Sequence, residues 1–164
     1  MIERDPALQE LLDHRAISQL SIDYMRGLDR LDLELLRSVY HPDATDDRGF
    51  FKGSGPEFCE FAIATLRDHK SNHHMLGQMN ISIEGDIAFG EIYFNAYHRI
   101  VADGVETDFV VIGRYIDRYE RRASVHSRAA SRLRRPPRPC HGRNHALPGT
   151  ARDRARARRA CRRD

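Results

Sequence analysis

Phenol, carboxylate and imidazole side chains occupy positions from which they could together transfer protons. Tyr24 and Asp29 lie five residues apart near the end of a long amphipathic segment. His73 and His74 open the first segment with strand periodicity, and His98 lies in the second. These groups are the usual general acids and bases near neutral pH. The residue types therefore indicate acid–base chemistry, on condition that the fold brings the positions into one pocket.

Each of the two residues in the helical segment has a second interpretation. Asp29 could be a base or orient one, or it could be a solvated carboxylate that caps the next helix. The Tyr24 phenol could hydrogen-bond a substrate carbonyl and stabilise the enolate formed by proton removal. Alternatively, Tyr24 continues the apolar stripe of Ile17 and Leu20 and belongs to the core.

Strand parity separates the histidines. Successive side chains in a strand point to opposite faces, so His73 and His74 should diverge and cannot easily share a metal ion. His98 has the parity of Ile92 and Phe94, which predicts that it points inward. It could then protonate a leaving group, although a lone buried histidine is more often structural.

Two amides extend the predicted pocket. Gln78 and Asn80 share the parity of His74, so we expect them to line the same face and contribute to binding. His73 is retained as a binding residue because either of the adjacent histidines could be the one that enters the pocket.

Helical patterns dominate the first third of the chain. A first helix is predicted from Pro6, with Asp5 as its cap, to about Gly27. A second, short helix should follow Asp32 and end at Pro42, where the ring stops helical hydrogen bonding.

The period then changes from helical to strand-like. Residues 43–53 read as a loop or short strand, and Pro56 begins a third helix. Turns at Gly85–Asp86 and Asp103–Gly104 separate three predicted strands. These strands cover residues 74–84, 87–101 and 107–121. The predicted fold class is therefore α+β, with three helices followed by an antiparallel meander.

Charge and composition change abruptly near Arg122. Residues 1–122 contain 14 Lys and Arg against 22 Asp and Glu, a net charge of −8, and hold every Phe and Tyr. Residues 123–164 contain 13 Arg and two acidic residues, a net charge of +11. The predicted organisation is one domain over residues 1–122 and an irregular, disordered tail over 123–164.

Several functional classes lack their sequence signals. The chain shows no phosphate-binding loop, zinc-ligand spacing or serine nucleophile elbow, so no cofactor and no metal are expected. The three cysteines have no metal-like spacing, and Cys59 reads as a small buried side chain. Without a hydrophobic signal core or a membrane-length apolar stretch, a cytoplasmic protein is expected, with no membrane partner. The arginine-rich tail has no aromatic or fold motif for nucleic acid, so none is expected as a partner.

Several short pieces of the chain follow one another in a characteristic order and spacing. They are Ala16-Ile17, Tyr24, Leu28-Asp29, Leu36, Tyr40-His41-Pro42-Asp43-Ala44, Lys52-Gly53, His73-His74-Met75-Leu76-Gly77-Gln78, Gly85-Asp86-Ile87-Ala88 and the run from Gly113 to Arg122. Together they resemble the SnoaL-like branch of the nuclear transport factor 2-like superfamily, and the resemblance covers about residues 8–122.

The resemblance implies a cone-shaped α+β barrel with a curved sheet around the helices and a deep pocket. It implies catalytic roles for Asp29 and His74, with Tyr24 at the spacing of a bile-acid dehydratase and His98 similar to a second histidine of scytalone dehydratase. The implied function is a cofactor-independent dehydratase acting next to a carbonyl of a small apolar or aromatic substrate. A polyketide cyclase, a ketosteroid-type isomerase and a non-catalytic binding or assembly module are the alternatives. A homodimer or homotrimer is also implied.

The tail departs from the family pattern. Family members continue with a strand that carries tryptophan and an inward arginine, whereas this chain has Ala123-Ser124-Val125-His126-Ser127-Arg128 and no Trp. Arginine without lysine, together with alanine and proline, is typical of a GC-rich gene read out of frame. We therefore hypothesise that the segment from about residue 123 onward is frameshifted.

Overall fold

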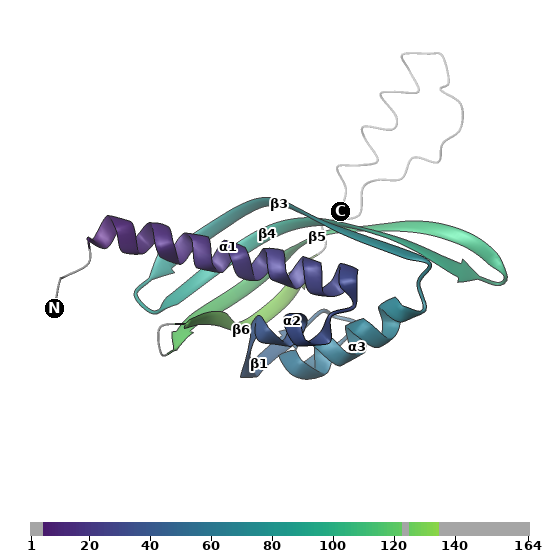
Figure 1. The fold of residues 1–164 in the computed structure, drawn as a ribbon, viewed down its shortest axis with the longest axis horizontal. Helices are drawn as coiled ribbons and strands as arrows, with labels where there is room; N and C mark the ends of the chain where they lie inside the picture. Colours follow the sequence, from purple (N-terminus) through teal and green to yellow (C-terminus); the bar gives the residue numbers. More distant parts are fainter. Residues whose placement is uncertain (1–4, 123–124, 135–164) are drawn as a thin grey trace, which may run out of the picture. The chain divides into compact units, whose positions relative to one another are not determined.

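The computed structural model describes residues 5–122 and 125–134, which form three helices and one sheet (Figure 1). The elements, in chain order, are α1 (Pro6–Arg30), α2 (Leu33–Ser38), β1 (Tyr40–Asp47), β2 (Lys52–Ser54), α3 (Gly55–Arg67), β3 (Ser71–Glu84), β4 (Ile87–Ala102), β5 (Val105–Arg122) and β6 (Val125–Arg134). The α+β class, with helices before the antiparallel strands, is confirmed.

Helix α1 is the longest helix and begins where the sequence predicted. The Asp5 carboxylate accepts a hydrogen bond from the backbone N–H of Ala7 at 2.9 Å. The helix runs to Arg30, one turn beyond the predicted end, and stops at Leu31, whose φ of 53° is left-handed. Because of this extra turn, Asp29 lies within the helix, on its last turn.

Helix α2 is shorter than predicted. Asp32 caps it by accepting from the N–H of Leu35 at 3.0 Å, but the helix ends at Ser38 and β1 starts at Tyr40. A residue before proline is pushed away from helical geometry, which favours an extended backbone ahead of Pro42. The apolar residues at 39–40 therefore mark the entry into a strand rather than a helical face.

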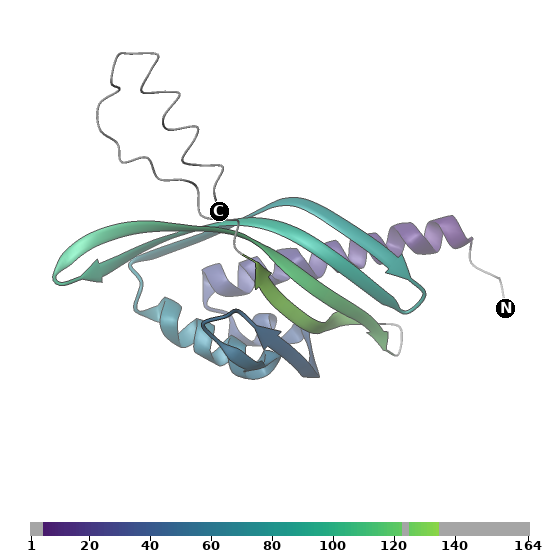
Figure 2. The ribbon, with the colours of Figure 1, turned by 180° about the vertical axis from the view of Figure 1, so that it is seen from behind.

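The sheet has the order β2-β1-β6-β5-β4-β3. β1 and β6 are parallel, and the other neighbours are antiparallel. Figure 1 and the reverse view in Figure 2 show the three helices gathered on one side of the curved sheet. This side holds the core and is called the inner face below.

Strand β6 lies in the segment that the sequence assigned to the tail. It pairs with β5 on one side and with β1 on the other. Strand pairing uses backbone groups, so a segment without aromatic residues can still complete a sheet. The predicted end of the ordered domain at residue 122 is therefore one strand too early. Residues 135–164, where the rest of the predicted tail lies, are outside the described residues.

A bulge in β3 reverses the parity of its second half. The pairing with β4 shifts between Leu76 and Met79, both of which are half-buried. Ile81 continues inward, whereas Gln78 and Asn80 are exposed. The prediction that these two amides share a face with His74 is therefore wrong, because the extra residue of a bulge sends every later side chain to the other face.

A buried ion pair lies beneath the helices. Arg48 Nη2 donates to Asp46 Oδ2 at 2.7 Å, and the Tyr40 hydroxyl donates to the same oxygen at 2.8 Å. The guanidinium carbon of Arg48 lies 4.2 Å from the ring centroid of Phe58 and 4.9 Å from that of Tyr115. The sequence predicted only a polar loop or short strand over residues 43–53, so this ion pair was not predicted.

Removing the charge of Asp46 should destabilise the protein strongly. We expect Asp46→Asn to lower the free energy of unfolding by about 3–5 kcal/mol, because Arg48 would remain buried without its carboxylate. The matched control is Glu60→Gln, which breaks the exposed ion pair with Arg37 and should cost less than about 1 kcal/mol. Urea denaturation of the two variants measures both values, and equal losses would contradict this account.

Candidate active site

The end of α1 and the start of β3 meet at a carboxylate–imidazole pair. Nδ1 of His74 donates to Oδ1 of Asp29 at 2.7 Å. The backbone N–H of His74 also approaches both carboxylate oxygens, at 3.1 and 3.3 Å. The His74 side chain is 6% exposed and that of Asp29 is 23% exposed. The two residues, 45 positions apart, thus form a short hydrogen bond in a largely enclosed place.

The bond to Asp29 sets the proton arrangement of the His74 ring. Because a carboxylate only accepts, Nδ1 carries the hydrogen and the neutral ring has its lone pair on Nε2. Burial lowers the pKa of His74 below its usual value, and the hydrogen bond to Asp29 acts in the opposite direction. At neutral pH the ring is therefore mainly uncharged, and Nε2 can accept a proton.

The neighbouring His73 does not share this environment. Its side chain is 62% exposed, and its Nδ1 lies 4.0 Å from the nearest oxygen of Asp29. Of the two adjacent histidines, His74 is the one that the structure pairs with Asp29.

His98 faces inward from β4, as its parity predicted, and is 7% exposed. Its Nδ1 lies 3.1 Å from Oδ1 of Asn72, and Nδ1 of His69 lies 2.8 Å from the same oxygen. The His98 ring stands edge-on to that of His74, with centroids 5.3 Å apart. Burial, followed by the nearby His74 and His69 rings, lowers the pKa of His98 to about 4. His98 is therefore neutral at pH 7.

Two residues of this cluster, His69 and Asn72, were not predicted. Asn72 lies two positions before His74 in the same strand, so its shared parity could have identified it. His69 lies in the connection between α3 and β3, where no periodicity indicates the direction of a side chain.

Apolar side chains adjoin these polar groups on the inner face. The His98 ring stacks on Phe109, its register partner in β5, with centroids 4.8 Å apart. In the next row His74 pairs with Ala96, which in turn pairs with Val111. The site thus combines two neutral imidazoles and one carboxylate with apolar and aromatic neighbours, an arrangement suited to proton transfer away from bulk water.

Tyr24 lies in the core. It is 1% exposed and makes edge-on ring contacts with Tyr40 and Tyr115, at centroid distances of 6.4 and 5.5 Å. Burial raises the pKa of the Tyr24 phenol well above its usual value. The structure favours the second interpretation of this residue, as part of the apolar stripe of α1.

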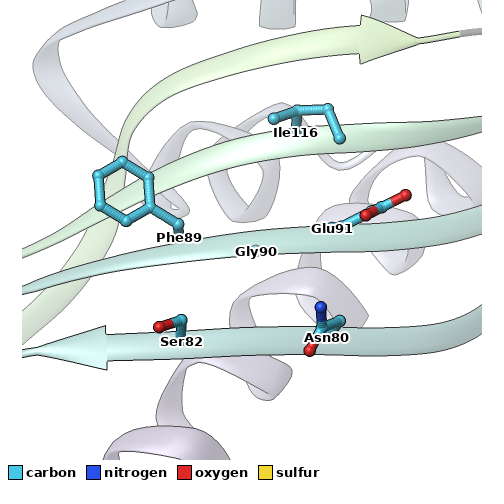
Figure 3. Close-up of a pocket in the computed structure, with 6 residues that line it drawn as sticks. All are labelled: Asn80, Ser82, Phe89, Gly90, Glu91 and Ile116. Atoms are coloured by element: carbon cyan, nitrogen blue, oxygen red, sulfur yellow. The ribbon is translucent and has the colours of Figure 1, made fainter.

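Asn80 lines a shallow hollow on the outer face, shown in Figure 3 with the helices behind the sheet. The hollow is bordered by Asn80, Ser82, Phe89, Gly90, Glu91 and Ile116. It contains none of the histidines, and it lies across the sheet from the Asp29–His74 pair. Asn80 is therefore not a binding residue of the candidate site.

Within the part of the chain whose side chains the structure describes, residues 5–122, no group of three or more His, Cys, Asp or Glu side chains is arranged to hold a metal ion. No described helix is both long and apolar enough to cross a membrane.

Solved structures of low sequence identity share this fold. A putative scytalone dehydratase from Novosphingobium aromaticivorans superposes with a TM-score of 0.69 at 19% identity, covering 78% of this chain and 87% of that one. A hexachlorocyclohexane dehydrochlorinase of type 3 from Novosphingobium barchaimii gives a TM-score of 0.72 at 20% identity, covering 87% of this chain and 99% of that one.

Curated sequences and a family model extend the comparison. An uncharacterised protein of Mycobacterium tuberculosis is 28% identical over 89 residues, or 52% of this chain. The match spans 60% of the length of that relative. The model of the SnoaL-like domain matches residues 9–126, which is most of the chain and includes every residue of the candidate site. The chain therefore belongs to the SnoaL-like domain family of the nuclear transport factor 2-like superfamily.

Proposed function

We propose that this protein is a cofactor-independent lyase, a dehydratase that removes water from a small apolar or aromatic carbonyl compound. The observation that carries the proposal is the 2.7 Å hydrogen bond between Asp29 and the ring of His74. It prepares a neutral imidazole as a base, and the apolar neighbours of the site suit a substrate of this class.

The proposed reaction needs only one acid–base group. Nε2 of His74 takes a proton from the carbon next to the carbonyl, and Asp29 stabilises the imidazolium that forms. The electron pair of the broken C–H bond forms a C=C bond as the C–O bond of the leaving hydroxyl breaks. The imidazolium then returns its proton to the departing oxygen, so water leaves and His74 is neutral again.

His98 has a different role from the one predicted. Protonation of the leaving group requires a charged ring, and a pKa near 4 leaves His98 neutral at pH 7. Its contribution is as a neutral ring that stands edge-on to His74 and can hydrogen-bond the substrate. Tyr24 has no step in this scheme, because its ring is packed in the core.

The geometry favours His74 rather than Asp29 as the base. A cyclase or isomerase scheme would have the Asp29 carboxylate abstract the proton. Both oxygens of Asp29 already accept from His74, one of them from its ring as well as its backbone. Its oxygens are already occupied by hydrogen bonds and are less available to take a proton from a substrate carbon.

The fold relatives support an elimination. A putative scytalone dehydratase and a hexachlorocyclohexane dehydrochlorinase are both named for reactions that remove a small molecule from the substrate. Loss of water from a hydroxy carbonyl compound is an elimination that a histidine base can carry out. The non-catalytic binding module remains the alternative that turnover assays decide.

We also propose a homodimer or homotrimer that buries the outer face of the sheet. Met75, Tyr93, Val110 and Ile112 lie on neighbouring strands of this face and are each 42–56% exposed. An exposed apolar patch of this kind is typical of an interface.

Removal of either member of the pair should abolish turnover. We expect His74→Ala and Asp29→Asn each to lower kcat/KM by about 10²-fold or more for dehydration of aryl β-hydroxy ketones, followed by the absorbance of the conjugated product. His73→Ala, the exposed neighbour, is the matched control and should stay within about threefold of the natural protein. An active His74→Ala with an inactive Asp29→Asn would favour the cyclase or isomerase scheme. Binding of the ketones without turnover would favour the module.

The lowered pKa of His98 predicts a pH-dependent stability. Between pH 6.5 and pH 4 the unfolded chain protonates this ring while the folded protein resists it, so acidification favours unfolding. From pH 7 to pH 5 we expect the free energy of unfolding to fall by about 1 kcal/mol more than in His98→Gln, which cannot titrate. His74 and His69, which face His98, are present in both proteins. Urea denaturation measures the free energy of unfolding of both proteins across this pH range. The same pH dependence in the natural protein and in His98→Gln would contradict a neutral, buried His98.

A charge in the outer patch should separate the subunits. We expect light scattering to show an oligomer for the natural sequence and a monomer for Ile112→Glu, because a buried unpaired carboxylate is costly at an interface. Leu11→Glu, on the exposed side of α1, is the control and should leave the oligomer intact. A monomeric natural protein would overturn the proposed assembly.

A further inference from the structure

The side chain of Asn72 lies between those of His69 and His98, and the proposed reaction assigns Asn72 no role. The residue lies on β3, two positions before His74, and is the register partner of His98 on β4. Its side chain therefore points to the inner face beside the Asp29–His74 pair. Its Oδ1 is the common neighbour of His69 Nδ1, at 2.8 Å, and His98 Nδ1, at 3.1 Å.

The backbone of α3 fixes which way the Asn72 amide points. Its Nδ2 lies 3.3 Å from the carbonyl oxygen of Leu66, which also accepts from the backbone N–H of His69. A carbonyl oxygen only accepts, so the amide nitrogen must face it and the amide oxygen must face the histidines. The reverse orientation would bring two oxygens together.

The amide oxygen in turn fixes the hydrogens of both rings. Oδ1 of Asn72 can only accept, so each short nitrogen–oxygen contact needs a hydrogen on the ring nitrogen. The two ring nitrogens also lie 3.2 Å from each other, within reach of a hydrogen bond, but both lie closer to the amide oxygen, at 2.8 and 3.1 Å, which favours a hydrogen on each. His98 thus carries its hydrogen on Nδ1, and its lone pair is on Nε2, at the other side of the ring from Asn72.

We propose that Asn72 is a positioning residue that locks His98 in the Nδ1–H form, so that the site presents a second imidazole lone pair beside that of His74. The chain of contacts runs from the Leu66 carbonyl through the Asn72 amide to His98. The role of this lone pair in catalysis rests on the proposed function, to which it adds a requirement on the substrate. A site with two imidazole acceptors selects a substrate that offers an O–H donor as well as an acidic C–H bond.

The consequence for substrate class is specific. The O–H group of a hydroxy carbonyl compound can donate to Nε2 of His98, which orients it while Nε2 of His74 takes the proton from carbon. A carbonyl compound whose leaving group lacks an O–H donor, such as a methyl ether, cannot donate a hydrogen bond to Nε2 of His98. Such a compound should be a poor substrate even when its size and apolar surface match.

The experiment reads the tautomer directly by ¹⁵N NMR of the histidine rings at pH 7. In the natural protein His98 should be protonated at Nδ1 and not at Nε2. Asn72→Leu, which removes the acceptor, should move His98 toward the Nε2–H form that unrestrained histidine prefers. Asn72→Asp keeps an acceptor oxygen and should retain the Nδ1–H form. Asn80→Leu, at an exposed position of the same strand, is the control and should change nothing.

Kinetics connect the tautomer to the reaction. We expect Asn72→Leu to lower kcat/KM about 10-fold or more for a hydroxy ketone, and to narrow the preference for it over the matching methyl ether. Asn72→Asp should recover the preference for the O–H donor.

The outcomes separate this inference from the proposed function. An Nε2–H His98 in the natural protein overturns the inference, whether or not any variant folds. So does a folded Asn72→Leu whose His98 tautomer is unchanged. If the tautomers follow the prediction while no ketone is turned over, the positioning role of Asn72 stands and the proposed dehydratase fails.

Discussion

The hydrogen bonds between Asp29 and His74 join the end of the longest helix to the start of the sheet. One carboxylate accepts from the ring of His74 at 2.7 Å and from its backbone N–H. The backbone contact fixes where β3 passes the helix, and the ring contact fixes which nitrogen carries the hydrogen. The position of the strand and the chemistry of the imidazole are therefore set by the same group.

Electrostatics divide the interior into two parts with different roles. Around His74 and His98, burial favours the neutral ring, which keeps proton acceptors available at neutral pH. Around Arg48, the buried charge is balanced by Asp46 and by aromatic rings and takes no part in the proposed reaction. In the histidine part, desolvation keeps the rings neutral and able to accept protons. In the Arg48 part, the ion pair with Asp46 holds β1 against the helices.

Residue types and periodicity predicted the parts of this structure that depend on local rules. The start of α1, the turns of the meander and the inward direction of His98 follow from capping, turn chemistry and strand alternation. The pairing of Asp29 with His74 could be anticipated only through the family resemblance, since nothing local relates residues 45 positions apart. Tyr24 shows the limit of such a resemblance, because the same spacing also fits a core residue.

The features that the sequence did not predict depend on contacts between segments far apart in the chain, which no local pattern contains. The bulge between Leu76 and Met79 inverts the parity on which Asn80 was assigned, and a bulge is visible only against the partner strand. Strand β6 forms through backbone pairing in a segment whose composition predicted disorder. Asn72 and His69 gain their roles from one shared oxygen atom, which is a tertiary contact rather than a motif.

The proposed chemistry depends on His74 being a neutral base whose hydrogen is held on Nδ1 by Asp29. Neutron diffraction from deuterated crystals at neutral pH tests it most directly, because deuterium positions on both ring nitrogens are seen. We expect deuterium on Nδ1 of His74, directed at Oδ1 of Asp29, and none on Nε2. Deuterium on Nε2 would contradict it, because Nε2 would then have no lone pair with which to take a proton from the substrate.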